Sequence, residues 1–244
     1  MHVLCGFIVV KSAWDSAGKR RLRGLQIGDE TLYLGERIIM AKLLDINPYN
    51  PQPRLIAQVV ELLKKGGVIA YPTDTMYGIG CDIFQQKAVK RVHQIKRRPK
   101  HKPFSFMCSC LKNISMYGHV SNTAYRLMKK NLPGPYTFVL PGTKLVPRVM
   151  LTRQKTVGIR VPDNPICLAM IEQVGNPILT TSALPAGHDV PVLDGRDVAE
   201  LFGKQVDLII DGGEIYPEPS TVISLLRDYP EILREGKGDS SFFR

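Results

Sequence analysis

The sequence predicts a single α/β (α+β) domain in which helices flank one twisted mixed sheet. Segments with apolar residues at helical spacing alternate along the chain with short apolar runs typical of buried strands. Glycine and proline separate most of these segments, as expected for turns. The second half holds several predicted strands with few helices between them, which favours a mixed sheet over a purely parallel one.

The first predicted helix covers residues 55–63, where apolar side chains recur at helical spacing before Gly66 and Gly67 end it. A buried strand at 68–71 follows. The other predicted helices cover residues 86–96, 121–131, 164–174 and 194–202. The other predicted strands cover residues 104–108, 136–140, 156–161, 178–182, 206–210, 221–225 and 231–234. Together these elements define a domain over residues 53–239.

Residues 1–39 are predicted to form an N-terminal extension that is disordered or precedes the true start of the protein. Residues 1–10 are mostly apolar, but Lys11 follows this run, whereas a secretory signal carries its basic residues in front. The segment has no clear helical or strand period, and better patterning begins at Met40. An arm that binds a partner is the alternative interpretation.

The chain carries 33 Lys and Arg residues against 22 Asp and Glu, a net charge of +11. Such an excess favours an anionic partner, either nucleic acid or nucleotide phosphates, although some basic proteins bind nothing acidic specifically. The five cysteines are scattered, which favours reduced thiols in a cytoplasmic protein. No apolar stretch approaches the roughly 18 residues of a membrane span, so no membrane partner is expected.

The loop at residues 71–80 is the first candidate site, because it directly follows a buried strand. Thr73, Asp74, Thr75 and Tyr77 place two hydroxyls, a carboxylate and a phenol within five positions, and two glycines follow. Loops at strand ends are common ligand sites in α/β sheets. An ordinary polar turn, with Asp74 bonded to its own backbone, is the alternative.

Residues 96–102 are the second candidate, with five cations and a histidine in seven positions. Lys96, Arg98 and Lys102 carry charge and donors suited to phosphates. Together with Lys87, Lys90 and Arg91, they could also form a stripe for nucleic acid. A solvated basic surface is the simplest alternative.

On the predicted strand at 156–161, Thr156 and Arg160 lie on the same face with Gly158 between them. We expect open space over Gly158 in which a ligand could lie, although an arginine in solvent at a sheet edge is the simpler interpretation. Ser220 and Arg234 stand beside later strands. The histidines and carboxylates show no metal-binding spacing, and neither a P-loop nor a GxGxxG motif is present, so no protein-bound metal is predicted.

Together these motifs resemble the YrdC-like family, and within it the YciO branch. The resemblance runs from about Arg54 to Gly238 and includes the segments at residues 72–80, 96–99, 102–103, 132–137, 156–162, 219–222 and 234–236. It implies the family fold, a twisted sheet with a large, basic concave cavity.

The resemblance also implies an activity. Known members are threonylcarbamoyl-AMP synthases, which join L-threonine, bicarbonate and ATP, release pyrophosphate and serve a tRNA modification. ATP would then be a substrate, and Mg²⁺ is expected with it. The implied ATP-binding residues are Lys96, Arg98, Lys102, Thr156, Ser182 and Arg234, with Lys96 and Arg98 catalytic. The implied threonine-binding residues are Thr75, Arg160 and Ser220.

One position departs from the family pattern. Its Ser-Ala-Asn motif reads Ser182-Ala183-Leu184 here. Leucine cannot make the hydrogen bonds of an amide, and the loss of one such bond typically costs about 1–3 kcal/mol. A weakened enzyme is therefore one expectation. The alternatives are a non-catalytic protein that binds double-stranded RNA, tRNA or rRNA, and an accessory factor in ribosome or tRNA maturation.

Overall fold

The computed structural model describes residues 40–97, 104–185 and 191–243, together with the backbone of three short strands nearer the N-terminus. The chain divides into two compact units, Met1–Met40 and Ala41–Arg244. Each unit is described by itself.

The first unit contains a small antiparallel sheet of three strands in the order β1-β2-β3. The strands are β1 (Val10–Lys11), β2 (Gly24–Ile27) and β3 (Glu30–Tyr33). The sequence pattern did not predict them. The interpretation of residues 1–39 as an N-terminal extension stays a prediction.

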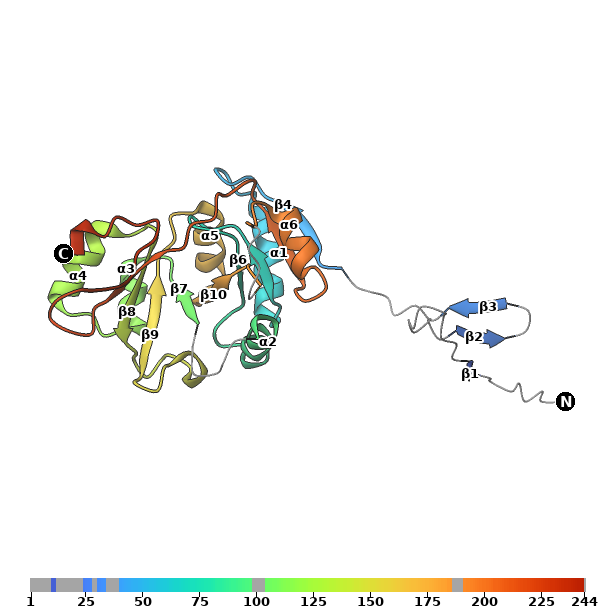
Figure 1. Cartoon of the computed structure of the whole chain (residues 1–244), viewed down its shortest axis with the longest axis horizontal. Coiled ribbons are helices and arrows are strands. Elements are labelled where there is room, and N and C mark those ends of the chain that lie inside the picture. The colour runs from blue at the N-terminus through green and yellow to red at the C-terminus, as the bar shows by residue number, and fades with distance from the viewer. Residues whose placement is uncertain are drawn as a thin grey trace. The chain divides into compact units, whose positions relative to one another are not determined.

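The second unit is built on one ten-stranded mixed sheet, in the order β13-β12-β8-β9-β7-β10-β6-β5-β11-β4 (Figure 1). The strands are β4 (Lys42–Asp45), β5 (Ile69–Tyr71), β6 (Gly78–Gly80), β7 (Ser105–Met107), β8 (Tyr136–Pro141), β9 (Thr156–Arg160), β10 (Ile178–Ser182), β11 (Leu208–Asp211), β12 (Thr221–Ser224) and β13 (Glu231–Arg234). β11 runs parallel to β4 and β5, whereas β10 runs antiparallel to β6 and β7. The predicted α/β class with a mixed sheet is therefore confirmed.

Among the described residues of this unit, six helices flank the sheet. They are α1 (Pro53–Lys64), α2 (Gln86–Lys96), α3 (Leu111–Tyr117), α4 (Asn122–Asn131), α5 (Pro165–Val174) and α6 (Gly195–Phe202). Figure 1 shows α3 and α4 near β8, and α1 and α6 near β4. Short 3-10 turns occur at Arg148–Met150 and Ser241–Phe243. Ser121, Asn164 and Asp194 begin helices by accepting hydrogen bonds from backbone N–H groups of the first turn.

The core lies on both faces of the sheet, because successive strand residues point to opposite sides. Ile69 and Tyr71 of β5 belong to the core formed with α1 and α5. Ala70, between them, belongs to the core formed with α2, α3, α4 and α6. Buried apolar residues on both faces explain why β5 reads as a continuous apolar run.

One part of the sheet lacks this two-sided apolar packing. On β8 and β9 the residues facing α3 and α4 are apolar, but no side chain of these two strands belongs to the described core of α1 and α5. Several of the alternate positions here and on the neighbouring strands are polar or glycine, whereas others, Val139 and Met107 among them, are apolar. We call this surface the polar face and define it by Ser105, Thr137, Gly158, Arg160 and Thr180.

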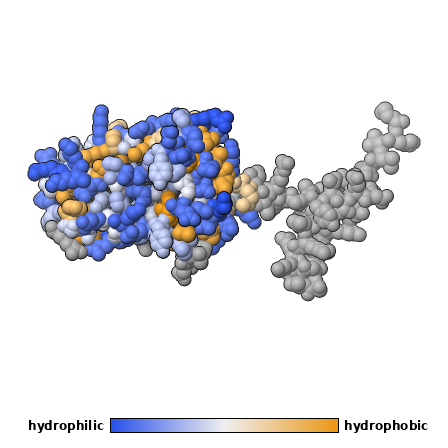
Figure 2. Space-filling view, turned by 90° about the horizontal axis from the view of Figure 1, so that it is seen from above, coloured by the Kyte–Doolittle hydropathy of each residue, from blue (hydrophilic) through white to orange (hydrophobic). Residues whose placement is uncertain are grey.

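On the face seen in Figure 2, the described surface of the second unit is mostly hydrophilic with smaller hydrophobic areas. Among the described residues, no helix is long and apolar enough to cross a membrane. The predicted helices and strands match observed elements to within two residues at each end. The strands β4 and β6 and the helix α3 were not predicted from the sequence.

Candidate functional site

A buried ion pair joins the loop at residues 71–80 to the polar face. The Nη2 atom of Arg160 donates to Oδ1 of Asp74 at 2.5 Å, and Nη1 donates to Oγ1 of Thr75 at 3.2 Å. The side chains of Arg160 and Asp74 are only 7% and 8% exposed. Arginine on β9 is therefore not a solvent-exposed edge residue, which was the simpler interpretation of the sequence.

The hydroxyl groups of this loop are bonded mainly within the loop. The Oγ1 of Thr73 donates to the carbonyl oxygen of Met76 at 2.6 Å. It also accepts from the backbone N–H groups of Thr75 and Met76 at 3.1 and 3.2 Å, so both of its lone pairs are used. The Oγ1 of Thr75 lies 3.0 Å from Oγ1 of Thr73 and accepts from Arg160. Thr73 therefore fixes the shape of the loop, and Thr75 contacts Arg160.

The C-terminal segment contributes the next group of residues. Arg234 on β13 donates from Nη2 to the carbonyl oxygen of Ser220 at 2.6 Å and to its Oγ at 3.1 Å. The Oγ of Ser220 also lies 2.9 Å from Oγ1 of Thr137, on the polar face. Lys237 donates to the carbonyl oxygen of Asp74 at 2.6 Å. The C-terminal segment thus brings two cations to the edge of the site.

Lys96 lies at the end of α2 and contacts the segment that follows β10. Its ammonium group donates to the carbonyl oxygens of Ser182 at 2.7 Å and Leu184 at 2.5 Å. The side chain of Leu184 is partly buried and packs against the core formed with α2 and α3. Leucine at this position therefore contributes to packing, and the predicted Lys96 and Ser182 are brought together.

The polar face carries hydroxyl groups directly above Gly158. A Cβ atom there would lie 2.5 Å from Oγ of Ser105 and 3.2 Å from Cγ2 of Thr137. The expectation of open space over Gly158 is therefore wrong, because these two side chains fill it. Ser105 is in turn the cross-strand partner of Thr180 on β10, which extends the row of hydroxyls across three strands.

Three predicted residues are not joined to this group. The contacts of Thr156 that involve side chains are local: its backbone N–H donates to Oγ1 of Thr152 in the preceding turn at 3.0 Å, and the two Oγ1 atoms lie 2.7 Å apart. Arg98 and Lys102 lie outside the described residues. Their roles stay predictions.

A buried thiol on α5 contacts the loop at residues 71–80. The Sγ of Cys167 on α5 donates to the carbonyl oxygen of Pro72 at 3.2 Å. Burial raises the pKa of Cys167 far above its ordinary value, and the nearby carboxylate of Asp74 adds to this rise. The thiol therefore stays protonated and supports the loop rather than acting as a nucleophile.

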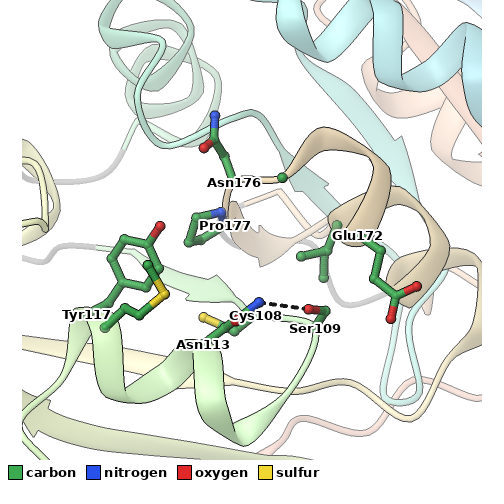
Figure 3. Close-up of a pocket in the computed structure, with 10 residues that line it drawn as sticks. Cys108, Ser109, Asn113, Tyr117, Glu172, Asn176 and Pro177 are labelled. Carbon is green, nitrogen blue, oxygen red and sulfur yellow. Dashed lines mark hydrogen bonds between the residues drawn. The ribbon is translucent and has the colours of Figure 1, made fainter.

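A pocket of about 260 Å³ lies elsewhere, between the end of β7 and the end of α5 (Figure 3). Its lining includes Cys108, Asn113 and Glu172, and Asn113 donates to Ser109 at 2.9 Å. None of the predicted site residues lines it. Because its only charged lining residue is an acid, this pocket is not suited to phosphates.

The described residues contain no group of three or more His, Cys, Asp or Glu side chains that could hold a metal ion. The cationic residues Lys96, Arg160, Arg234 and Lys237 all contact segments around the polar face. Together with the row of hydroxyls, they define an α/β protein with a cationic, hydroxyl-rich face.

Comparison with known proteins gives the family. Residues 61–236 match the Sua5_yciO_yrdC family model, described as "Telomere recombination". The chain belongs to this family. It is 47% identical over 201 residues to the uncharacterized protein YciO of Escherichia coli K12, covering 82% of this chain and 98% of that protein. The crystal structure of E. coli YciO superposes with a TM-score of 0.80, covering 84% of this chain and all of the other.

Relatives with a named activity are more distant. The threonylcarbamoyl-AMP synthase of Pyrococcus abyssi is 36% identical over 176 residues, 71% of this chain but 52% of that protein. The crystal structure of P. abyssi Sua5 complexed with L-threonine has a TM-score of 0.74 at 33% identity, covering 80% of this chain and 57% of the other. This chain thus spans about half the length of those synthases.

Two of the residues in the site were missed as candidates from the sequence. Asp74 was noted only as part of a polar loop, and Lys237 was not singled out. The position of Asp74 between Thr73 and Thr75 in a candidate loop was the only signal, and its contact with Arg160 is evident only from the structure. Lys237 carried no signal apart from its place three residues after Arg234.

Proposed function

We infer that this protein binds ATP and L-threonine on its polar face and forms L-threonylcarbamoyl-AMP with release of pyrophosphate. The observation that carries this proposal is the convergence of Thr75, Arg160 and Ser220, the three predicted threonine-binding residues, around the loop that contains Asp74. The synthases among its relatives, at about 35% identity, support the same activity.

In this proposal the two kinds of residue have different tasks. Arg160, Thr75 and Ser220 hold the amino acid. Lys96 and Arg234, with Arg98 and Lys102, hold the phosphates. When the carbamate oxygen of the threonine adduct attacks the α-phosphorus, the bond to the bridging oxygen of the β-phosphate breaks and negative charge builds on the leaving pyrophosphate. Fixed cations stabilise that charge.

Magnesium would enter as part of the substrate. Mg²⁺ commonly binds to nucleotide phosphates with few protein ligands, which suits a face with few carboxylates. It would neutralise phosphate charge during the transfer.

The test is pyrophosphate release by the full chain with L-threonine, bicarbonate, Mg²⁺ and ATP. We expect release that requires threonine and falls at least about a hundredfold in Lys96→Ala and Arg98→Ala, as for loss of a group that stabilises transition-state charge. Lys90→Ala is the matched control, because Lys90 is exposed on the same helix. No release above background from the folded wild type would contradict the proposal.

The net charge of +11 favours RNA binding as the second candidate. It predicts affinity for double-stranded RNA that falls steeply with salt. In that case Lys90→Ala and Lys87→Ala should weaken binding, whereas they should leave pyrophosphate release unchanged. The same set of variants thus separates the two functions.

A further inference from the structure

The Asp74–Arg160 pair is incompletely bonded although it is buried. Among the described residues, neither Oδ2 of Asp74 nor Nε of Arg160 has a hydrogen-bond partner, and both atoms are buried. Buried polar atoms are nearly always paired in folded proteins, so an unpaired donor and an unpaired acceptor in one pair point to a missing ligand.

The two open positions have opposite chemistry. An ionised carboxylate only accepts hydrogen bonds, and a guanidinium only donates them. A ligand that completes both must therefore bring a donor to Asp74 and an acceptor to Arg160. The hydroxyl group of Thr75, which accepts from Nη1 of Arg160, lies beside these two positions.

Charge balance further limits the class of ligand that this site can bind. The pair is neutral as a whole, and its side chains are 7% and 8% exposed. A simple carboxylate would leave excess negative charge in a buried place, which is costly. A zwitterion with adjacent ammonium and carboxylate groups adds no net charge and supplies both the donor and the acceptor.

We propose that Asp74 is a specificity-determining residue that binds the α-amino nitrogen of an amino-acid ligand while Arg160 binds its carboxylate. The proposal rests on the amino-acid half of the proposed function. It adds that Asp74 makes the site select α-amino acids against the corresponding 2-hydroxy acids, which have the same shape and carboxylate but no amine.

The test measures binding to the full-length wild-type protein by isothermal titration calorimetry without ATP. The ligands are L-threonine, 2,3-dihydroxybutanoate of matching configuration, which lacks the amine, and L-threoninol, which lacks the carboxylate. We expect L-threonine to bind at least about tenfold more tightly than either analogue, because dihydroxybutanoate brings a net negative charge and L-threoninol a net positive charge to a buried pair that is neutral as a whole. Equal affinity for L-threonine and dihydroxybutanoate, or no binding of L-threonine, would overturn the proposal.

Two variants extend the test. In Asp74→Asn we expect weaker binding of L-threonine and unchanged or tighter binding of dihydroxybutanoate, so that the preference disappears. Asp163→Asn is the matched control, an exposed acid three residues beyond Arg160, and should keep the wild-type preference. A folded Asp74→Asn protein with the wild-type preference would overturn the proposal. If Asp74→Asn does not fold, the analogue comparison on the wild type decides alone.

The result is independent of catalysis. If the wild type prefers L-threonine as expected but releases no pyrophosphate, the specificity role of Asp74 stands and the proposed activity fails. If pyrophosphate is released and dihydroxybutanoate binds as tightly as L-threonine, the activity stands and the role of Asp74 fails.

Discussion

The ammonium group of Lys96 donates a 2.5 Å hydrogen bond to the backbone carbonyl oxygen of Leu184, the position at which the chain departs from the Ser-Ala-Asn motif. This bond ties the end of α2 to the segment after β10. Lys96 therefore has a structural partner as well as its proposed phosphate. The backbone at residue 184 has a role that does not depend on the side chain there.

Replacing Lys96 should therefore weaken the fold as well as nucleotide binding. We expect Lys96→Met to lower the free energy of unfolding by about 1–3 kcal/mol, as for lost hydrogen bonds to a charged donor. Urea denaturation measures this. The exposed Lys90→Met should change it by less than about 0.5 kcal/mol. Equal urea midpoints for the two variants would show that the bonds to Ser182 and Leu184 do not contribute.

Leu184→Asn should have opposite effects on stability and binding. The amide restores a polar group next to Ser182, so ATP affinity or turnover should rise. Stability should fall by about 1–3 kcal/mol because an apolar side chain is lost from the core. Leu184→Ala separates the two effects, since it loses the packing without gaining an amide. Both properties are measured by ATP titration and urea denaturation. An unchanged or lower ATP affinity in Leu184→Asn would count against this interpretation.

Gly158→Ala should destabilise the polar face. The new Cβ would lie 2.5 Å from Oγ of Ser105, which must move. We expect a loss of about 1–3 kcal/mol, typical of overpacking. Adding Ser105→Ala removes the closest atom and should recover part of the loss in thermal unfolding. If the double variant is no more stable than Gly158→Ala alone, the collision is not the cause.

Stability should decline at alkaline pH. Burial raises the pKa of the Cys81, Cys108 and Cys167 thiols above the ordinary value of 9.0. The unfolded chain therefore loses these protons at lower pH than the folded chain. The stabilisation is complete below about pH 9, declines as pH rises above that value, and is fully lost only when pH has risen through the higher pKa of the folded thiols. Urea midpoints from neutral pH to about pH 10 measure the decline, and Cys167→Ala should make it shallower. A constant midpoint over this range would contradict the prediction.

Elements with a long apolar period were predictable, and short ones were not. The helix α1 shows its buried stripe of Ile56, Val59, Val60 and Leu63 directly in the sequence. The seven-residue α3 buries only two side chains, which is too few to show a period. The strand β6 is rich in glycine and reads as a loop. Glycine at residue 80 allows β10 to approach closely, since a Cβ there would lie 1.9 Å from the backbone oxygen of Leu179. This close approach is evident only in the folded sheet.

The candidate site residues came from motifs in the sequence, but their partners in the structure could not be predicted. Asp74 and Arg160 are 86 positions apart, and Lys96 and Leu184 are 88 apart. Such contacts depend on the order of the strands, which places β9 beside β7 and β8. No local pattern contains that order. The same limit explains why Gly158 was expected to lie under open space, since its neighbours come from two other strands.

The position of β10 has a consequence for motion. It lies between β6 and β7 and pairs with both, so a hinge at this place would break backbone bonds on two sides of one strand. Its amide protons should accordingly be among the slowest in the molecule to exchange with deuterium, released mainly by global unfolding. The strands beside β10 then keep their spacing. A ligand of the proposed site would therefore bind to strands that folding has already placed, without a further loss of backbone entropy.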